Sequence, residues 1–198
     1  MRRPLNRPGA RLLNHIELVY PPGDRSLARA LLEGLGFRVL DPQTDHPLPA
    51  NLGPAADPYL IVYLDPSDED LIDNVLYASE AGEAQWRFEE ALRARMQDDQ
   101  ELAALHHELR SAYSGMPQAM THFGVAYPNA DEVDAAMARL ASKPELEGRI
   151  RLSDVFRPGD PGSVDDRVVQ GFVYTDILSV GLLAGGQQIE LQVRLDGV

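Results

Sequence analysis

This chain of 198 residues contains no cysteine. Disulfide bonds, thiolate nucleophiles and cysteine metal ligands are therefore excluded. If the protein binds a metal ion, histidine and carboxylate side chains are the strong ligands left to it.

Basic residues are also few, with 18 Lys and Arg against 31 Asp and Glu and a formal net charge of -13. Because nucleic-acid binding needs a basic surface against the phosphates, we expect no nucleic-acid partner. No apolar run approaches the ~20 residues of a membrane span, and no apolar segment follows the basic residues 1–11. We therefore expect a cytoplasmic protein without a membrane partner.

A phrase near the N-terminus is repeated in the second half. Residues 14–21 read Asn-His-Ile-Glu-Leu-Val-Tyr-Pro, and residues 121–128 read Thr-His-Phe-Gly-Val-Ala-Tyr-Pro. Each copy is followed by an aspartate, Asp24 or Asp131, at the expected start of a helix, and Asp24 is a plausible N-cap. The repeat predicts a duplicated module with two equivalent imidazoles that face one shared site.

Hydrophobic periodicity and turn residues predict the same β-α-β-β-β order in each half. The expected strands are 13–20, 37–40, 59–64 and 74–79 in the first half, and 121–127, 149–156, 168–175 and 187–195 in the second. Residues 83–113 have helical composition, and a capping box of Asp98 with Glu101 allows two helices that meet there.

The predicted fold class is α+β. Two βαβββ modules are expected to form a curved, barrel-like mixed sheet around one cavity, with the helices outside. The expected division is an N-terminal arm (1–12), a first module (13–82), an inserted helical linker (83–117) and a second module (118–198).

Three side chains are candidate metal ligands. His15 and His122 lie on the strand faces turned away from the helices, and Glu190 lies on the polar face of the last strand. A cavity between the two non-helical faces would bring them together. Two imidazoles and one carboxylate form a set that suits non-haem Fe(II), and that also holds Mn, Ni, Co or Zn.

These features resemble the vicinal oxygen chelate superfamily, which includes glyoxalase I, extradiol dioxygenases and bleomycin-resistance proteins. The resemblance is carried by Leu13–Val19, Leu31–Phe37, Thr121–Val125 and Gln188–Leu191. It implies that His15, His122 and Glu190 bind a divalent metal ion. The family's fourth ligand position falls near Tyr77, with Glu80 as the alternative.

The expected function is a metal-dependent isomerase, lyase or dioxygenase that acts on a small molecule with two neighbouring oxygens. Glu17, Tyr77 and Tyr174 are the candidate catalytic acid/base residues, and no organic cofactor is expected. The alternative is a metal-free protein of the bleomycin-resistance type that binds a small molecule or antibiotic. A small molecule is the expected partner, and a homodimer is compatible with either function.

Overall fold

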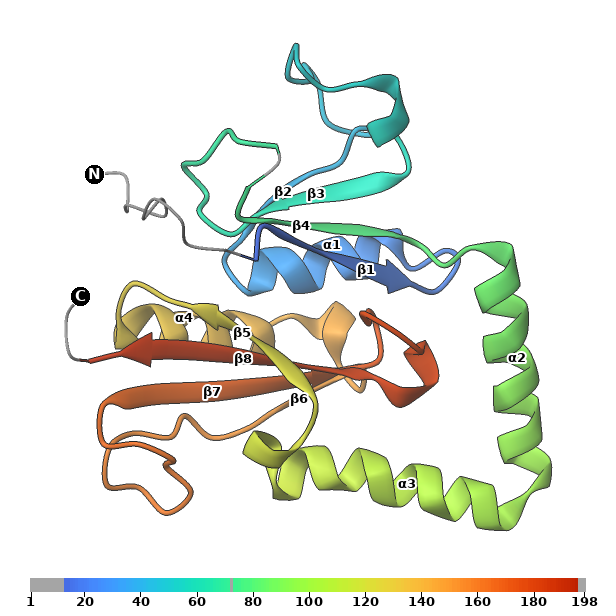
Figure 1. Ribbon diagram of the computed structural model, residues 1–198, viewed down its shortest axis with the longest axis vertical. Coiled ribbons are helices and arrows are strands. Elements are labelled where there is room, and N and C mark those ends of the chain that lie inside the picture. Colours follow the sequence, from blue (N-terminus) through green and yellow to red (C-terminus); the bar gives the residue numbers. More distant parts are fainter. Residues whose placement is uncertain (1–12, 72, 196–198) are drawn as a thin grey trace.

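The computed structural model describes residues 13–71 and 73–195. The expected N-terminal arm, residues 1–12, lies outside the described residues. Two four-stranded mixed sheets and four helices make up the described part of the chain, which confirms the α+β class (Figure 1).

Each half of the chain contributes one sheet. The first sheet contains β1 (His15–Tyr20), β2 (Arg38–Leu40), β3 (Tyr59–Tyr63) and β4 (Val75–Glu80). The second sheet contains β5 (His122–Ala126), β6 (Ile150–Leu152), β7 (Val168–Thr175) and β8 (Gln187–Arg194). The strand orders are β1-β4-β3-β2 and β5-β8-β7-β6, so the two halves have the same topology.

The strand pairing also matches between the two sheets. In each half the first strand runs parallel to the last, and the other neighbours are antiparallel. The parallel pair requires a long connection, which the helix and the two middle strands provide. Glu17 pairs with Tyr77 in the first sheet, as Gly124 pairs with Glu190 in the second. This register gives residues 122–126 and 188–192 of the second sheet counterparts at 15–19 and 75–79 of the first.

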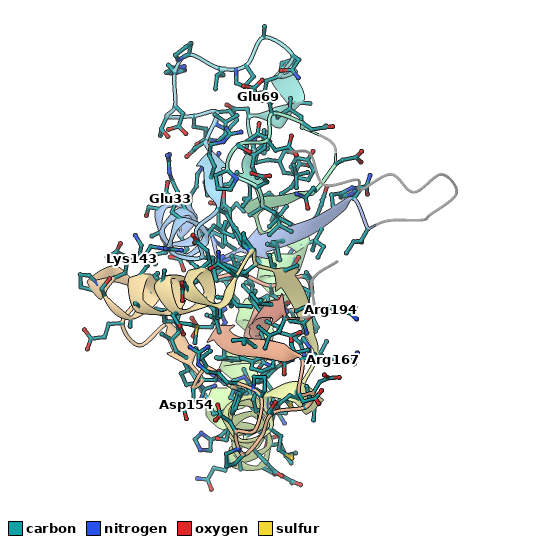
Figure 2. All side chains as sticks on the ribbon, turned by 90° about the vertical axis from the view of Figure 1, so that its left-hand side faces the viewer. Glu33, Glu69, Lys143, Asp154, Arg167 and Arg194 are labelled. Carbon is teal, nitrogen blue, oxygen red and sulfur yellow. The ribbon has the colours of Figure 1, made fainter. Side chains whose placement is uncertain are left out.

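The helices α1 (Arg25–Gly34) and α4 (Ala130–Ala141) lie on one side of the sheets, and a single core joins both modules on that side. In Figure 2, Glu33 of α1 and Lys143 after α4 point to one side of the molecule, and Arg167 and Arg194 point to the other. The alternation of apolar and polar residues along the strands produces these two faces, because successive side chains point in opposite directions.

The hydrogen bonding of the described residues does not close the two sheets into a barrel, so the barrel-like part of the predicted fold is not confirmed. Strand β1 pairs with β4 along one edge. It also makes an isolated bridge to the second module, in which Val19 and Ser179 exchange two backbone hydrogen bonds. A one-residue bridge joins the modules without building a continuous ladder.

The linker forms two helices, α2 (Glu83–Asp98) and α3 (Gln100–Gly115), which meet at an angle beside the second sheet (Figure 1). The predicted break near Asp98 is confirmed, but the cap is its neighbour Asp99, whose side chain accepts from Leu102 N–H. Asp24 makes no capping hydrogen bond, and α4 is capped by Asn129 ahead of the expected Asp131.

Four short 3-10 helices complete the fold. They are η1 (Pro54–Ala56), η2 (Pro117–Ala119), η3 (Pro144–Leu146) and η4 (Leu183–Gly185). No helix in the described part of the chain combines the length and the apolar composition needed to cross a bilayer.

Candidate functional site

The non-helical face of the second sheet carries a group of buried polar side chains. Gln188, Glu190 and Gln192 project from β8, because they alternate with the core residues Ile189 and Leu191. Only 6% of Glu190 is exposed, whereas a carboxylate on an uncovered strand would face solvent. A buried carboxylate requires specific partners.

Two glutamines hold one oxygen of Glu190. The side-chain amides of Gln170, on β7, and Gln192, on β8, both donate to Glu190 Oε1, the second at 2.9 Å. These two bonds engage Oε1, and the other oxygen, Oε2, lies near His122.

His122 is oriented by the backbone just before its own strand. Its Nδ1 lies 2.6 Å from the carbonyl oxygen of Met120. A carbonyl oxygen only accepts hydrogen bonds, so Nδ1 is the donor, and in the neutral imidazole Nε2 then presents its lone pair. Metal-binding histidines are usually fixed in this way. The edge of the Phe172 ring also packs against the imidazole, with the ring centroids 5.7 Å apart.

His122 Nε2 and Glu190 Oε2 lie 3.4 Å apart. In the tautomer described above both atoms are acceptors, so they repel one another unless a proton or a metal ion balances them. Two donors that are each ~2.1 Å from one ion are separated by roughly 3.0–3.4 Å at octahedral or tetrahedral angles. The pair therefore has the atom types and the spacing of two metal ligands.

Gly124 gives Glu190 the room to adopt this position. A Cβ atom at residue 124 would lie 3.0 Å from Glu190 Oε2. A glycine within a strand often marks such a close approach, so Gly124 is a sequence signal for this position that was not among the predictions. Gln192 was likewise not predicted as a partner of Glu190.

His15 occupies the position in β1 that His122 occupies in β5, as the repeat predicts. Its side chain is exposed and packs edge-on against Tyr77, with ring centroids 5.9 Å apart. No three histidine, aspartate or glutamate side chains among residues 13–71 and 73–195 lie close enough to hold one metal ion. The structure thus brings together His122 and Glu190, and leaves His15 outside that pair.

The corresponding face of the first sheet is largely apolar. Tyr77 stands opposite Glu17 where Glu190 stands opposite Gly124, and Ile61 takes the place of Phe172. Loop residues Leu52 and Leu71 pack against Ile61 and its neighbours in a second, smaller core. The duplicated positions therefore differ in chemistry: the carboxylate is on the last strand in the second sheet (Glu190) and on the first strand in the first sheet (Glu17).

Among the predicted acid/base residues, Glu17 is exposed on the non-helical face of β1. The hydroxyl of Tyr77 donates to the carbonyl oxygen of Leu71. Burial, with smaller effects from Tyr63, Glu17 and Asp70, raises the pKa of the Tyr77 phenol. Burial also raises the pKa of Tyr174, although two neighbouring arginines oppose that shift. Both phenols therefore stay protonated at neutral pH, and Tyr77 donates its hydroxyl proton to Leu71, whereas the hydroxyl of Tyr174 has no partner among the described residues.

The alternative fourth ligand, Glu80, is excluded by its position. It follows Leu76 and Ala78 at intervals of two residues, so it shares their face, which packs on the helices. Its carboxylate accepts a hydrogen bond from Gly23 N–H at the start of the α1 turn. On β4, the residue whose position corresponds to that of Glu190 on β8 is Tyr77, which lies on the non-helical face.

Comparison of the chain with protein-family models, with curated proteins and with solved structures gives no match. The function is therefore inferred from the arrangement of the site residues alone. They present an oriented imidazole and an oriented carboxylate on one sheet face, which suits metal binding or proton transfer.

Proposed function

We propose that this protein is a divalent-metal-dependent enzyme, similar to the vicinal oxygen chelate superfamily, that acts on a small molecule with two neighbouring oxygens. The observation that supports this proposal is the His122–Glu190 pair. Its two acceptor atoms face each other at 3.4 Å, and each side chain is fixed by further hydrogen bonds. Such outer hydrogen bonds are typical of metal ligands.

His122 and Glu190 would hold the ion, and His15 is the candidate for the third ligand. His15 would have to leave the ring of Tyr77 to join them, and the two non-helical sheet faces would then border one cavity. When bound, a divalent ion supplies Lewis-acid polarisation of two neighbouring substrate oxygens.

Side chains of the protein would accept and donate the proton that is transferred in the reaction. Glu17 is an exposed carboxylate two residues from His15 on the same face, about 7 Å along the strand. It is the candidate proton acceptor, because an ionised carboxylate only accepts. Tyr77 and Tyr174, with raised pKa values, are donors in this scheme and would stabilise negative charge on the substrate.

Metal content after reconstitution with Fe, Mn, Ni, Co or Zn tests the proposal. The wild-type protein should retain about one ion, and His122→Ala and Glu190→Gln should each lose it. His107→Ala is the matched control, because His107 is an exposed histidine on α3. His15→Ala should weaken retention if it completes the site. Failure of the wild-type protein to retain any of the five metals would refute the proposal.

A second candidate is a metal-free protein that binds a small molecule. The packing of His15 against Tyr77 favours it, because this packing leaves two metal donors together and separates the third. The net charge of -13 suits a cationic ligand. Tight binding of a cationic antibiotic by protein that retains no metal would establish this function in place of the first.

A further inference from the structure

A small pocket lies between the C-terminal end of α3 and the non-helical face of the second sheet. Its volume is about 50 Å³. The wall is formed by α3 residues Tyr113 and Ser114 on one side, and by Arg151, Phe172, Tyr174 and Gln188 on the other. The helical linker therefore covers part of this face of the second sheet. Among the elements that the structure describes, no such helix lies over the corresponding face of the first sheet.

The pocket is close to the His122–Glu190 pair. Phe172 is directly opposite Glu190 in the sheet, and its ring contacts His122. Tyr174 and Gln188, which line the pocket, form the next pair on the same face. Two residues along a strand span about 7 Å, so the pocket lies within the length of one small molecule from Glu190.

Arg151 provides a positive charge in this pocket. Its guanidinium stacks on the ring of Tyr174, 4.4 Å from the centroid, and donates to the carbonyl oxygen of Arg110 at 2.7 Å. No carboxylate in the described part of the chain lies within ion-pair distance of Arg151. A guanidinium has five N–H donors, so Arg151 has donors in excess of those its protein partners use.

The first module contains the same arginine–tyrosine stack, but there a loop covers the arginine. Arg38 pairs with Tyr63 as Arg151 pairs with Tyr174, and its guanidinium lies 3.7 Å from the Tyr63 centroid. There the loop after β3 covers the arginine, which donates to two backbone carbonyl oxygens, those of Pro66 and Asp68. In the second module no such loop covers Arg151, and the pocket borders it instead.

Tyr174, whose ring lines the pocket, also has an unused polar atom. Its hydroxyl is buried against Gly186 and has no hydrogen-bond partner among the described residues. Such a group is costly, at about 1–3 kcal/mol, unless a ligand or water satisfies it. The volume of the pocket fits a group of a few heavy atoms, such as a carboxylate, and excludes a ring.

We propose that this pocket is a substrate subsite that binds a carboxylate through Arg151. The inference rests on the proposed function, because the two neighbouring oxygens of the same substrate would face His122 and Glu190. The substrate class is thereby narrowed to small acids whose carboxylate lies a few bonds from the oxygen pair.

Two probes that differ in this carboxylate test the subsite. 2-Oxoglutarate has two neighbouring oxygens and a distal carboxylate, and 2-oxopentanoate has the same oxygens without that group. Calorimetric titration of the wild-type protein should show about tenfold tighter binding of 2-oxoglutarate, as expected for a hydrogen bond to a charged group. Arg151→Met should abolish this preference, and Arg151→Lys should retain part of it.

Arg87→Met is the matched control, since Arg87 is an exposed arginine of α2 outside the pocket lining and its loss changes the net charge equally. Equal binding of the two acids by the wild-type protein, or binding of neither, would overturn the subsite. An equal effect of Arg87→Met would overturn it too, because the preference would then reflect net charge. Metal content is measured on the same samples, so loss of the subsite and loss of the metal function are separate results.

Discussion

At the scale of single residues, the His122–Glu190 pair depends on neighbours that have no reactive chemistry of their own. The Met120 carbonyl fixes the imidazole tautomer, and two glutamine amides hold one carboxylate oxygen. Gly124 leaves the other oxygen free to face the imidazole. The site is therefore sensitive to changes at positions that carry no charge.

Gly124→Ala should disrupt the pair without unfolding the sheet. The added Cβ would lie 3.0 Å from Glu190 Oε2 and push that oxygen away from His122. Metal affinity should fall by about tenfold to a hundredfold, as for other displaced ligand supports. Metal titration of the variant and the wild-type protein gives the ratio.

Gly53→Ala is the control, because a Cβ there meets nothing within 4 Å and the backbone φ is -76°. It should leave metal affinity unchanged. Unchanged affinity in Gly124→Ala would mean that Glu190 Oε2 does not contact the ion.

At the scale of elements, buried polar contacts attach the helical linker to the second module. Glu89 of α2 is fully buried, and its carboxylate accepts from the N–H groups of Leu183 and Ala184 at 2.6 and 2.9 Å. His106 of α3 lies 2.6 Å from the carbonyl oxygen of Ala184. His106 is therefore partly buried, because η4 packs against α3.

Glu89→Gln should loosen the linker from η4. One acceptor oxygen becomes an NH2 group that faces backbone N–H donors, so at least one of the two bonds is lost. The free energy of unfolding should fall by about 1–3 kcal/mol, as for loss of a hydrogen bond to a charged group. Urea denaturation measures the loss, and amide exchange at residues 183 and 184 should accelerate.

Glu90→Gln is the matched control, because Glu90 is the exposed neighbour on the same helix. It should change stability by less than about 0.5 kcal/mol. Equal effects of the two substitutions would show that Glu89 does not anchor the linker.

At the scale of the whole molecule, the modules are joined by polar contacts as well as by the shared core. Arg149 donates to Asp24 of the first module at 3.0 Å and to Asp176 of the second at 2.6 Å. Tyr127 donates to the carbonyl oxygen of Leu35 across the same boundary at 2.7 Å. Asp24 thus serves as a contact between modules and makes no capping hydrogen bond to α1.

Arg149→Met should weaken the boundary between the modules. Two part-buried ion pairs are lost, so the free energy of unfolding should fall by about 1–2 kcal/mol. Arg157→Met is the control, because Arg157 pairs with Asp134 within the second module and both side chains are more exposed. It should cost less than about 1 kcal/mol. Urea denaturation followed by Trp86 fluorescence checks both values, and a smaller loss in Arg149→Met than in Arg157→Met would contradict this role.

Much of the fold could be predicted from the sequence, because alternation and helical periodicity are local properties. The eight strands, the helix in each module and the two linker helices all lie near their predicted ranges. Two details differ from the prediction: Asp99 caps α3 in place of its neighbour Asp98, and β6 (Ile150–Leu152) is shorter than its predicted range. Sheet closure was not predictable, because it depends on how two edges meet in space.

The repeat and the hydrophobic periodicity of the linear sequence were sufficient to predict the duplicated order of elements. The alternation of side chains along a strand gave the face on which most candidate residues lie. Which candidates meet depends on tertiary packing. It buries Glu190 against two glutamines and beside His122, packs His15 on Tyr77 and turns Glu80 toward the helices. Distances across a sheet and between modules arise from packing and register, and a linear pattern does not specify them.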